Sequence, residues 1–174
     1  MKKKNPTDYC IQSNVFMLAR YARIVQDNGM VPIVEPEVLM DGDHSIHDCN
    51  EVTGKTLKLL FNQLSSHGVY LGGMLLKPNM VISGKKCSPQ ASIQEVAKMT
   101  LNCLEENVSP EVPGIVFLSG GQSNELATEH LNEMNKLKKK LPWKLSFSYG
   151  RALQQPSLSL WQGKKENVKN AQDA

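Results

Sequence analysis

The sequence has no long uninterrupted run of apolar residues. No stretch approaches the ~18 consecutive apolar residues that a membrane-spanning helix needs, so we expect no transmembrane segment. Lys2, Lys3 and Lys4 stand near the start, but the apolar core of a secretory signal peptide does not follow them. Both absences favour a cytoplasmic protein.

Cysteine is scarce, and the charge is close to balanced. The four cysteines lie far apart, form no CxxC pair and give no disulfide framework; they stand at positions 10, 49, 87 and 103. We therefore expect reduced thiols. The net charge of +3 is too small to indicate a nucleic-acid-binding surface, which usually has a strongly basic face.

One short run contains metal-type ligands. Asp41, Asp43 and His44 lie close together in the sequence, and His47 follows them. The same run is typical of a turn rich in Asp and Gly, which is the expectation here. The sequence therefore predicts no metal site.

The remaining composition is typical of a folded α/β domain. Apolar residues make up 40% of the chain and charged residues 21%. Helices are expected at about 14–28, 48–65, 92–106, 123–137 and 158–168, and strands at about 31–38, 69–77, 114–118 and 145–148. Apolar strands separated by amphipathic helices indicate a parallel sheet that is covered by helices.

The strand ends are spaced like those of a β/α barrel. They lie near Glu37, Lys77, Ser119 and Ser148, which are 40, 42 and 29 residues apart. In such barrels the active site lies at the carboxyl ends of the strands. The polar residues at these ends are therefore the candidates for chemistry.

Two carboxylates close the first strand. Glu35 and Glu37 flank Pro36, and residues two apart on an extended chain face the same way. Mutual repulsion would raise the pKa of one of them and make it a proton donor near neutral pH. A solvated acidic loop is the alternative, because charged residues are usually exposed.

A lysine closes the second strand. Lys77 follows the apolar residues 74–76, where an inward side chain would be desolvated. Desolvation lowers the pKa of an amine, and a neutral amine attacks ketones to form an imine. Alternatively, the side chain extends to the surface.

Glycine-rich segments follow the third and fourth strands. Ser119, Gly120 and Gly121 precede a predicted helix, whose free N–H groups favour an anion. The sequence Ser148-Tyr149-Gly150-Arg151 adds a hydroxyl and a guanidinium. Together they predict a phosphate site, although each alone could be an ordinary turn.

Four motifs, VPIVEPE, LLKPNM, FLSGGQS and FSYGRALQ, occur in this order and at these spacings. They resemble those of the class I, or Schiff-base, fructose-bisphosphate aldolases. The resemblance implies a TIM (β/α)8-barrel fold of which this chain contains the last four βα units, a half barrel. It covers an aldolase-like domain at 14–174 and leaves a polar, unmatched segment at 1–13.

The resemblance also implies roles for the candidates. Lys77 is similar to the Schiff-base lysine, Glu35 to the general acid/base of imine formation, and Glu37 to a second carboxylate that holds the lysine site. The residues that resemble the site for one substrate phosphate are Ser119, Gly120, Gly121, Ser148, Gly150 and Arg151. The implied reaction is the reversible cleavage of fructose 1,6-bisphosphate to dihydroxyacetone phosphate and glyceraldehyde 3-phosphate, without cofactor or metal. Members of the family are homotetramers.

The chain departs from the family pattern in several places. It begins just before the fifth strand of the barrel, so the aspartate and lysines of earlier strands have no counterpart. Gly72, Met74 and Met40 stand where glutamate, threonine and proline are expected. The alternative to an active aldolase is a catalytically impaired fragment with a phosphate- or partner-binding role. Its open sheet edges predict self-association.

Overall fold

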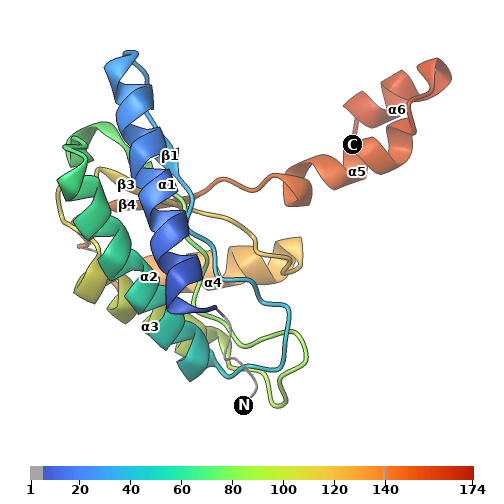
Figure 1. Ribbon diagram of the computed structural model, residues 1–174. Helices are drawn as coiled ribbons and strands as arrows, with labels where there is room; N and C mark the ends of the chain where they lie inside the picture. The colour runs from blue at the N-terminus through green and yellow to red at the C-terminus, as the bar shows by residue number, and fades with distance from the viewer. Residues whose placement is uncertain (1–5, 139) are drawn as a thin grey trace.

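A four-stranded parallel sheet organises the chain (Figure 1). A computed structural model describes residues 6–138 and 140–174, except for the side chains of residues 151 and 152. The strands are β1 (Ile33–Val34), β2 (Leu75–Leu76), β3 (Gly114–Phe117) and β4 (Lys144–Phe147). They lie side by side in sequence order, β1-β2-β3-β4. This order is that of a β/α barrel, since a doubly wound sheet reverses direction at a switch point. The predicted α/β half barrel is confirmed.

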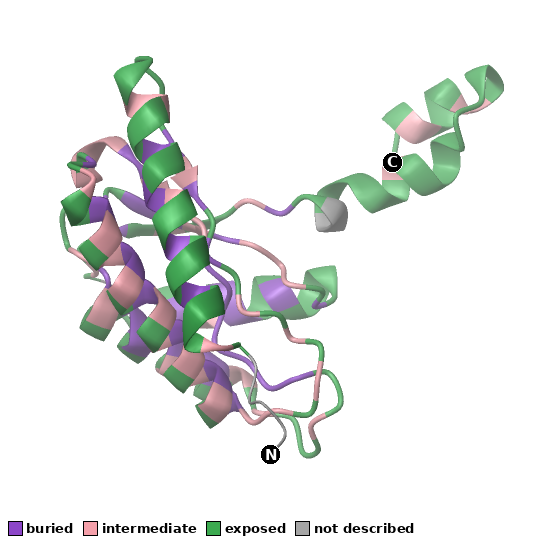
Figure 2. Ribbon diagram, in the orientation of Figure 1, coloured by how far each residue is buried: buried purple, intermediate pink, exposed green. Residues whose placement is uncertain are grey.

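Four helices pack beside one another along the sheet. They are α1 (Asp8–Asp27), α2 (Ile46–Ser66), α3 (Ile93–Asn107) and α4 (Asn124–Leu137). α1 packs against α2, α2 against α3, and α3 against α4 (Figure 1). Buried residues line the faces that these helices turn toward the sheet, whereas the outer face of α1 is exposed (Figure 2).

The helix ends follow the local signals in the sequence. Ser45, Ser92 and Ser123 cap α2, α3 and α4, and each hydroxyl accepts a backbone N–H three residues on. Gly29 and Gly68 follow α1 and α2 with φ values of +72° and +65°, a conformation that favours glycine. The expected helices at 48–65, 92–106 and 123–137 are therefore confirmed to within a few residues.

The expected start of the first helix at Asn14 was wrong. α1 begins at Asp8, and the Thr7 hydroxyl accepts the N–H of Cys10 as its cap. The buried residues Ile11 and Val15 extend the apolar stripe of α1 to both sides of position 13. The proposed division of the chain into residues 1–13 and 14–174 stays a prediction.

The first two strands are much shorter than expected. Only two residues of each pair as β-structure, in place of the predicted 31–38 and 69–77. Pro36 and Pro78 follow the paired residues and have no N–H to donate to a neighbouring strand. Before β2, the pair Gly72-Gly73 lies in the 3-10 helix η1 (Leu71–Gly73). The carboxyl ends of both strands thus continue as loops, which carry the candidate residues.

The tail also differs from the expectation of one helix at 158–168. α5 (Arg151–Trp161) begins earlier and contains Pro156, and it is followed by η2 (Lys165–Asn167) and α6 (Val168–Gln172). Positive φ values at Gln162 and Gly163 break the chain between them. α5 and α6 pack on each other and stand away from the sheet (Figure 1).

Apolar side chains are exposed where the half barrel is open. Phe147 on β4 is 48% exposed, and the arm formed by α5 and α6 is exposed along most of its length (Figure 2). Exposed apolar residues of that arm include Leu153, Leu158, Leu160, Trp161 and Val168. Within the described residues, no helix combines the length and the apolar character that a membrane span requires.

Candidate active site

Lys77 and Glu35 form an ion pair at the carboxyl edge of the sheet. Val34 pairs with Leu76 in adjacent strands, so the two charged residues follow partnered positions. Lys77 Nζ lies 2.9 Å from Glu35 Oε2. The lysine side chain is 18% exposed and the glutamate side chain 49%, so the amine is largely covered while the carboxylate faces solvent. The structure thus places a base beside the candidate nucleophile.

Glu37 is exposed and is not part of this pair. It lines, with Glu35, a groove of about 1180 Å³ between α1 and the loop that follows β1. Within the described part of the chain, its side chain makes no hydrogen bond or ion pair with Lys77. Glu35 is therefore the carboxylate that directly contacts the lysine.

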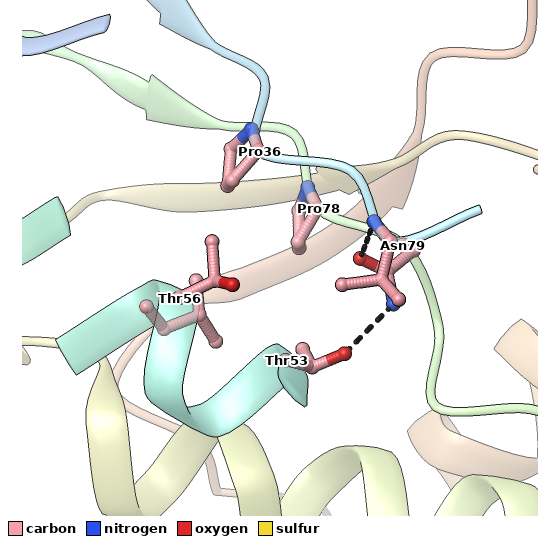
Figure 3. Close-up of a pocket in the computed structure, with 7 residues that line it drawn as sticks. Pro36, Thr53, Thr56, Pro78 and Asn79 are labelled. Atoms are coloured by element: carbon pink, nitrogen blue, oxygen red, sulfur yellow. Dashed lines mark hydrogen bonds between the residues drawn. The ribbon is translucent and has the colours of Figure 1, made fainter. Parts of the chain in front are cut away.

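Asn79 holds the two loops that carry these residues. Its side-chain Oδ1 accepts the N–H of Val38 at 2.9 Å, and its Nδ2 donates to Thr53 Oγ1 on α2 at 3.1 Å (Figure 3). Pro36 and Pro78 lie beside this link and, with Thr53 and Thr56 of α2, line a small pocket (Figure 3). Sequence reasoning missed Asn79, because its partners are far away in the chain.

A second link joins the loops further from the sheet. Three backbone hydrogen bonds of 2.8–2.9 Å run from residues 84–86 to residues 40–44. A Cβ added at Gly84 would lie 2.6 Å from the Gly42 carbonyl oxygen, so only glycine allows this approach. The run from Asp41 to His44 is a bend that takes part in this link. In the described residues, no group of three or more His, Cys, Asp or Glu side chains is placed to hold a metal.

Ser119, Gly120 and Gly121 form the turn between β3 and α4. Gly120 and Gly121 have φ values of +61° and +81°, which favour glycine. The Gln122 N–H donates a hydrogen bond to the Ser119 carbonyl at 3.1 Å, and Ser123 caps α4. The turn therefore precedes a helix amino terminus, where backbone N–H groups favour an anion.

A buried pair supports this turn from behind. Gln122 Nε2 donates to the Ser119 carbonyl at 2.9 Å, so its Oε1 is the acceptor that faces His130 Nδ1 at 2.7 Å. His130 Nδ1 must therefore carry a proton. Burial lowers the pKa of His130, which favours the neutral ring.

The segment after β4 lies beside the Ser119 turn. The Ser148 N–H donates to the Phe117 carbonyl at 2.9 Å, and Gly150 stands at the start of α5. Tyr149, which sequence reasoning passed over, is buried and donates its hydroxyl to the Ala127 carbonyl of α4 at 3.0 Å. Burial raises the pKa of Tyr149. The side chain of Arg151 lies outside the described residues.

The cysteines take no part in the Lys77–Glu35 pair. All four are free thiols, as expected, and Cys49 and Cys103 are buried. Burial raises the pKa of the Cys103 thiol to about 12, which keeps it protonated and unreactive.

A Lys–Glu pair and a glycine-rich turn at the ends of parallel barrel strands match the aldolase motifs. The family profile described as "Glycolytic: Fructose-bisphosphate aldolase class-I" matches residues 1–174. The chain belongs to this family. A probable class 1 fructose-bisphosphate aldolase of Xanthomonas campestris pv. campestris is 57% identical over 90% of this chain and 46% of its own length. Fructose-bisphosphate aldolase B of Gallus gallus is 54% identical over 97% of this chain and 46% of its own length.

Solved structures agree on the family fold. The fructose-bisphosphate aldolase of Plasmodium falciparum is 52% identical and superposes with a TM-score of 0.92 over 98% of this chain and 49% of that protein. A relative from Arabidopsis thaliana, 54% identical, is named as cytosolic. The chain spans about half the length of the curated relatives it matches.

Proposed function

We propose that this chain carries the Schiff-base chemistry of a fructose-bisphosphate aldolase, with Lys77 as the covalent catalyst. The observation that carries the proposal is the contact of 2.9 Å between Lys77 Nζ and Glu35 Oε2 in a chain of this family. The substrate is fructose 1,6-bisphosphate, and the products are dihydroxyacetone phosphate and glyceraldehyde 3-phosphate. The chemistry needs no metal or cofactor, and a cytoplasmic location fits the cytosolic relative.

The pair supplies the proton transfers of imine formation. Glu35 takes a proton from the Lys77 ammonium, and the neutral amine adds to the ketone carbon of the substrate. The resulting carbinolamine loses water with a proton from Glu35, which leaves a protonated imine. That imine accepts the electrons of the bond between the third and fourth carbons as it breaks, while the Glu35 carboxylate, which has just given up its proton, takes the proton of the C4 hydroxyl. The aldehyde product leaves, and protonation and hydrolysis of the enamine release the ketone product and free Lys77.

Glu37 is assigned a supporting role. Glu37 lines the same groove as Glu35. Its negative charge lies two residues from the Glu35 that contacts Lys77, and it would help to stabilise the cationic imine because opposite charges attract.

The glycine-rich segments bind one phosphate of the substrate. Ser119, Gly120 and Gly121 offer backbone groups beside the amino terminus of α4, and Ser148 and Gly150 come from the neighbouring strand. Arg151 is assigned the guanidinium that neutralises the phosphate charge. Lys77 ends the strand on the other side of β3, so a substrate held by its phosphate would direct its ketone toward the amine.

A second candidate function is favoured by the open sheet. Both β1 and β4 have an unpaired edge, and the arm of α5 and α6 exposes apolar side chains. Such edges pair readily with another chain. In this reading the half barrel binds a phosphate or a partner without completing catalysis, and it self-associates or joins a homo-oligomer.

Cleavage of fructose 1,6-bisphosphate by the purified chain tests the proposal. The release of triose phosphate is measured for the wild-type chain, for Lys77→Ala and for the exposed-lysine control Lys58→Ala. Cleavage that survives in Lys58→Ala and is lost in Lys77→Ala supports the aldolase function. A folded chain that binds phosphate but cleaves no substrate favours the second candidate.

A further inference from the structure

A second lysine lies against the glycine-rich turn. A Cβ built on Gly121 would lie 3.0 Å from Lys85 Nζ and 3.3 Å from Lys85 Cε, so the ammonium group lies beside the backbone of this turn. Lys85 comes from the loop after β2, on the opposite side of β3 from Ser148 and Arg151. Neither the sequence motifs nor the assignments above give Lys85 a role.

The position of Lys85 is fixed by its backbone. Its N–H donates to the Met40 carbonyl at 2.8 Å, within the three hydrogen bonds that join residues 84–86 to residues 40–44. The adjacent Gly84 packs closely against the Gly42 carbonyl. The side chain therefore starts from a backbone segment that hydrogen bonds and close packing hold in place, and it extends to Gly121.

The charge of Lys85 is only weakly neutralised. Its one ion-pair partner among the described residues is Asp41, whose Oδ1 lies 3.3 Å from Nζ. The two side chains are 48% and 69% exposed, and exposed pairs of this kind contribute little because water screens them. A phosphate dianion on the Gly120-Gly121 turn would carry more charge than Asp41 and would lie as near to the ammonium.

We propose that Lys85 is a further phosphate-binding and specificity-determining residue, which exchanges Asp41 for the substrate phosphate when the turn is occupied. This inference rests on the proposed function, because it uses the turn at 119–121 as the phosphate site. Lys85 contacts the phosphate from the β2 side of the turn, and Arg151 is assigned the contact from the β4 side. In this exchange Asp41 competes with the ligand for the Lys85 ammonium group. Asp41 therefore weakens the binding of doubly charged phosphates most, and it weakens the binding of singly charged or uncharged ligands least.

The test is an NMR titration of the Gly120 and Gly121 amide signals with dihydroxyacetone phosphate and with inorganic phosphate. Lys85→Met removes the charge and keeps the length of the side chain, and Lys86→Met makes the same charge change at the next position. Lys85→Met should weaken both phosphate ligands roughly 3- to 10-fold relative to Lys86→Met. Asp41→Asn should tighten them, but only when Lys85 is present. Dihydroxyacetone, which lacks the phosphate, should bind all the variants alike.

The outcomes separate the two proposals. Equal phosphate affinity in Lys85→Met and Lys86→Met would overturn the role of Lys85 while leaving the cleavage chemistry intact. A wild-type chain in which phosphate moves neither glycine signal would overturn both the role of Lys85 and the phosphate site itself. Loss of cleavage alone, with the phosphate response unchanged, would count against the aldolase function and not against Lys85.

Discussion

Replacing Asn79 with alanine removes the side chain that links the loops after β1 and β2. Three hydrogen bonds to nitrogen or oxygen are lost, to Val38 N at 2.9 Å and to Thr53 Oγ1 and Met80 O at 3.1 Å each, together with a weaker one from Nδ2 to Cys49 Sγ at 3.9 Å. Asn79 and Thr53 are buried, so water does not readily replace the missing partner. At ~1 kcal/mol for each bond, the free energy of unfolding should fall by about 3 kcal/mol.

Urea unfolding followed by circular dichroism measures this loss. The matched control is Asn102→Ala on the exposed side of α3, which should change the free energy of unfolding by less than ~0.5 kcal/mol. A double-mutant cycle with Thr53→Val should return a coupling of about 1 kcal/mol, because the two side chains share one hydrogen bond. If the urea midpoints of Asn79→Ala and Asn102→Ala were equal, and the dependence of the free energy of unfolding on urea were also equal, the idea that Asn79 links the loops would be refuted.

Three further predictions concern the pair, the loop contact and the buried histidine. Glu35→Gln should slow adduct formation at Lys77 by ~100-fold, because an amide cannot take the proton of the amine; an unchanged rate of borohydride-trapped adduct would exclude Glu35 as the base. Gly84→Ala should lower the free energy of unfolding by about 1–3 kcal/mol. Gly150→Ala, where an added Cβ meets no atom within 4 Å, should not lower it, and equal thermal midpoints would contradict the close loop approach. His130→Gln should make the free energy of unfolding depend less on pH in mildly acidic solution, which urea unfolding at a series of pH values measures. An unchanged slope of that free energy against pH would mean that groups other than His130 cause the dependence.

The direction of the His130 effect follows from its burial. Burial lowers the pKa of His130 below the ordinary value of about 6.5. As the pH falls below that value, the unfolded chain binds a proton that the folded chain does not. The stability that neutral His130 contributes is therefore fully present above the pKa of the unfolded chain. It is lost as the pH falls toward the pKa of the folded chain, by up to ~1.4 kcal/mol per pH unit. Glutamine has no such titration and can still contact Gln122.

The helix boundaries could be predicted where a local signal exists. Ser92 begins an S-x-x-E pattern, and its hydroxyl does accept the Glu95 N–H at 3.3 Å. Gly29 and Gly68 end helices for the same local reason, since they adopt positive φ. The start of α1 was missed because Ile11 alone continues the buried apolar stripe before Val15, although Thr7 caps the helix.

The strands and the site depended on contacts that the sequence does not display. β1 and β2 look long in the sequence, but their pairing ends at Pro36 and Pro78. Lys77 and Glu35 could be placed together, because both follow strands that are adjacent in a parallel sheet. The hydrogen bond between Asn79 and Val38, and the position of Lys85 beside Gly121, could not be predicted. Each joins loops whose paths are set by the packing of the whole domain.

Borohydride trapping of the chain with dihydroxyacetone phosphate, followed by peptide mapping of every lysine, tests the role of Lys77 directly. We expect one stable adduct on Lys77, absent from Lys77→Ala and retained in Lys58→Ala. A folded chain that forms no adduct, or one whose adducts are spread over exposed lysines with Lys77 unmodified, would contradict the claim that Lys77 is the covalent catalyst.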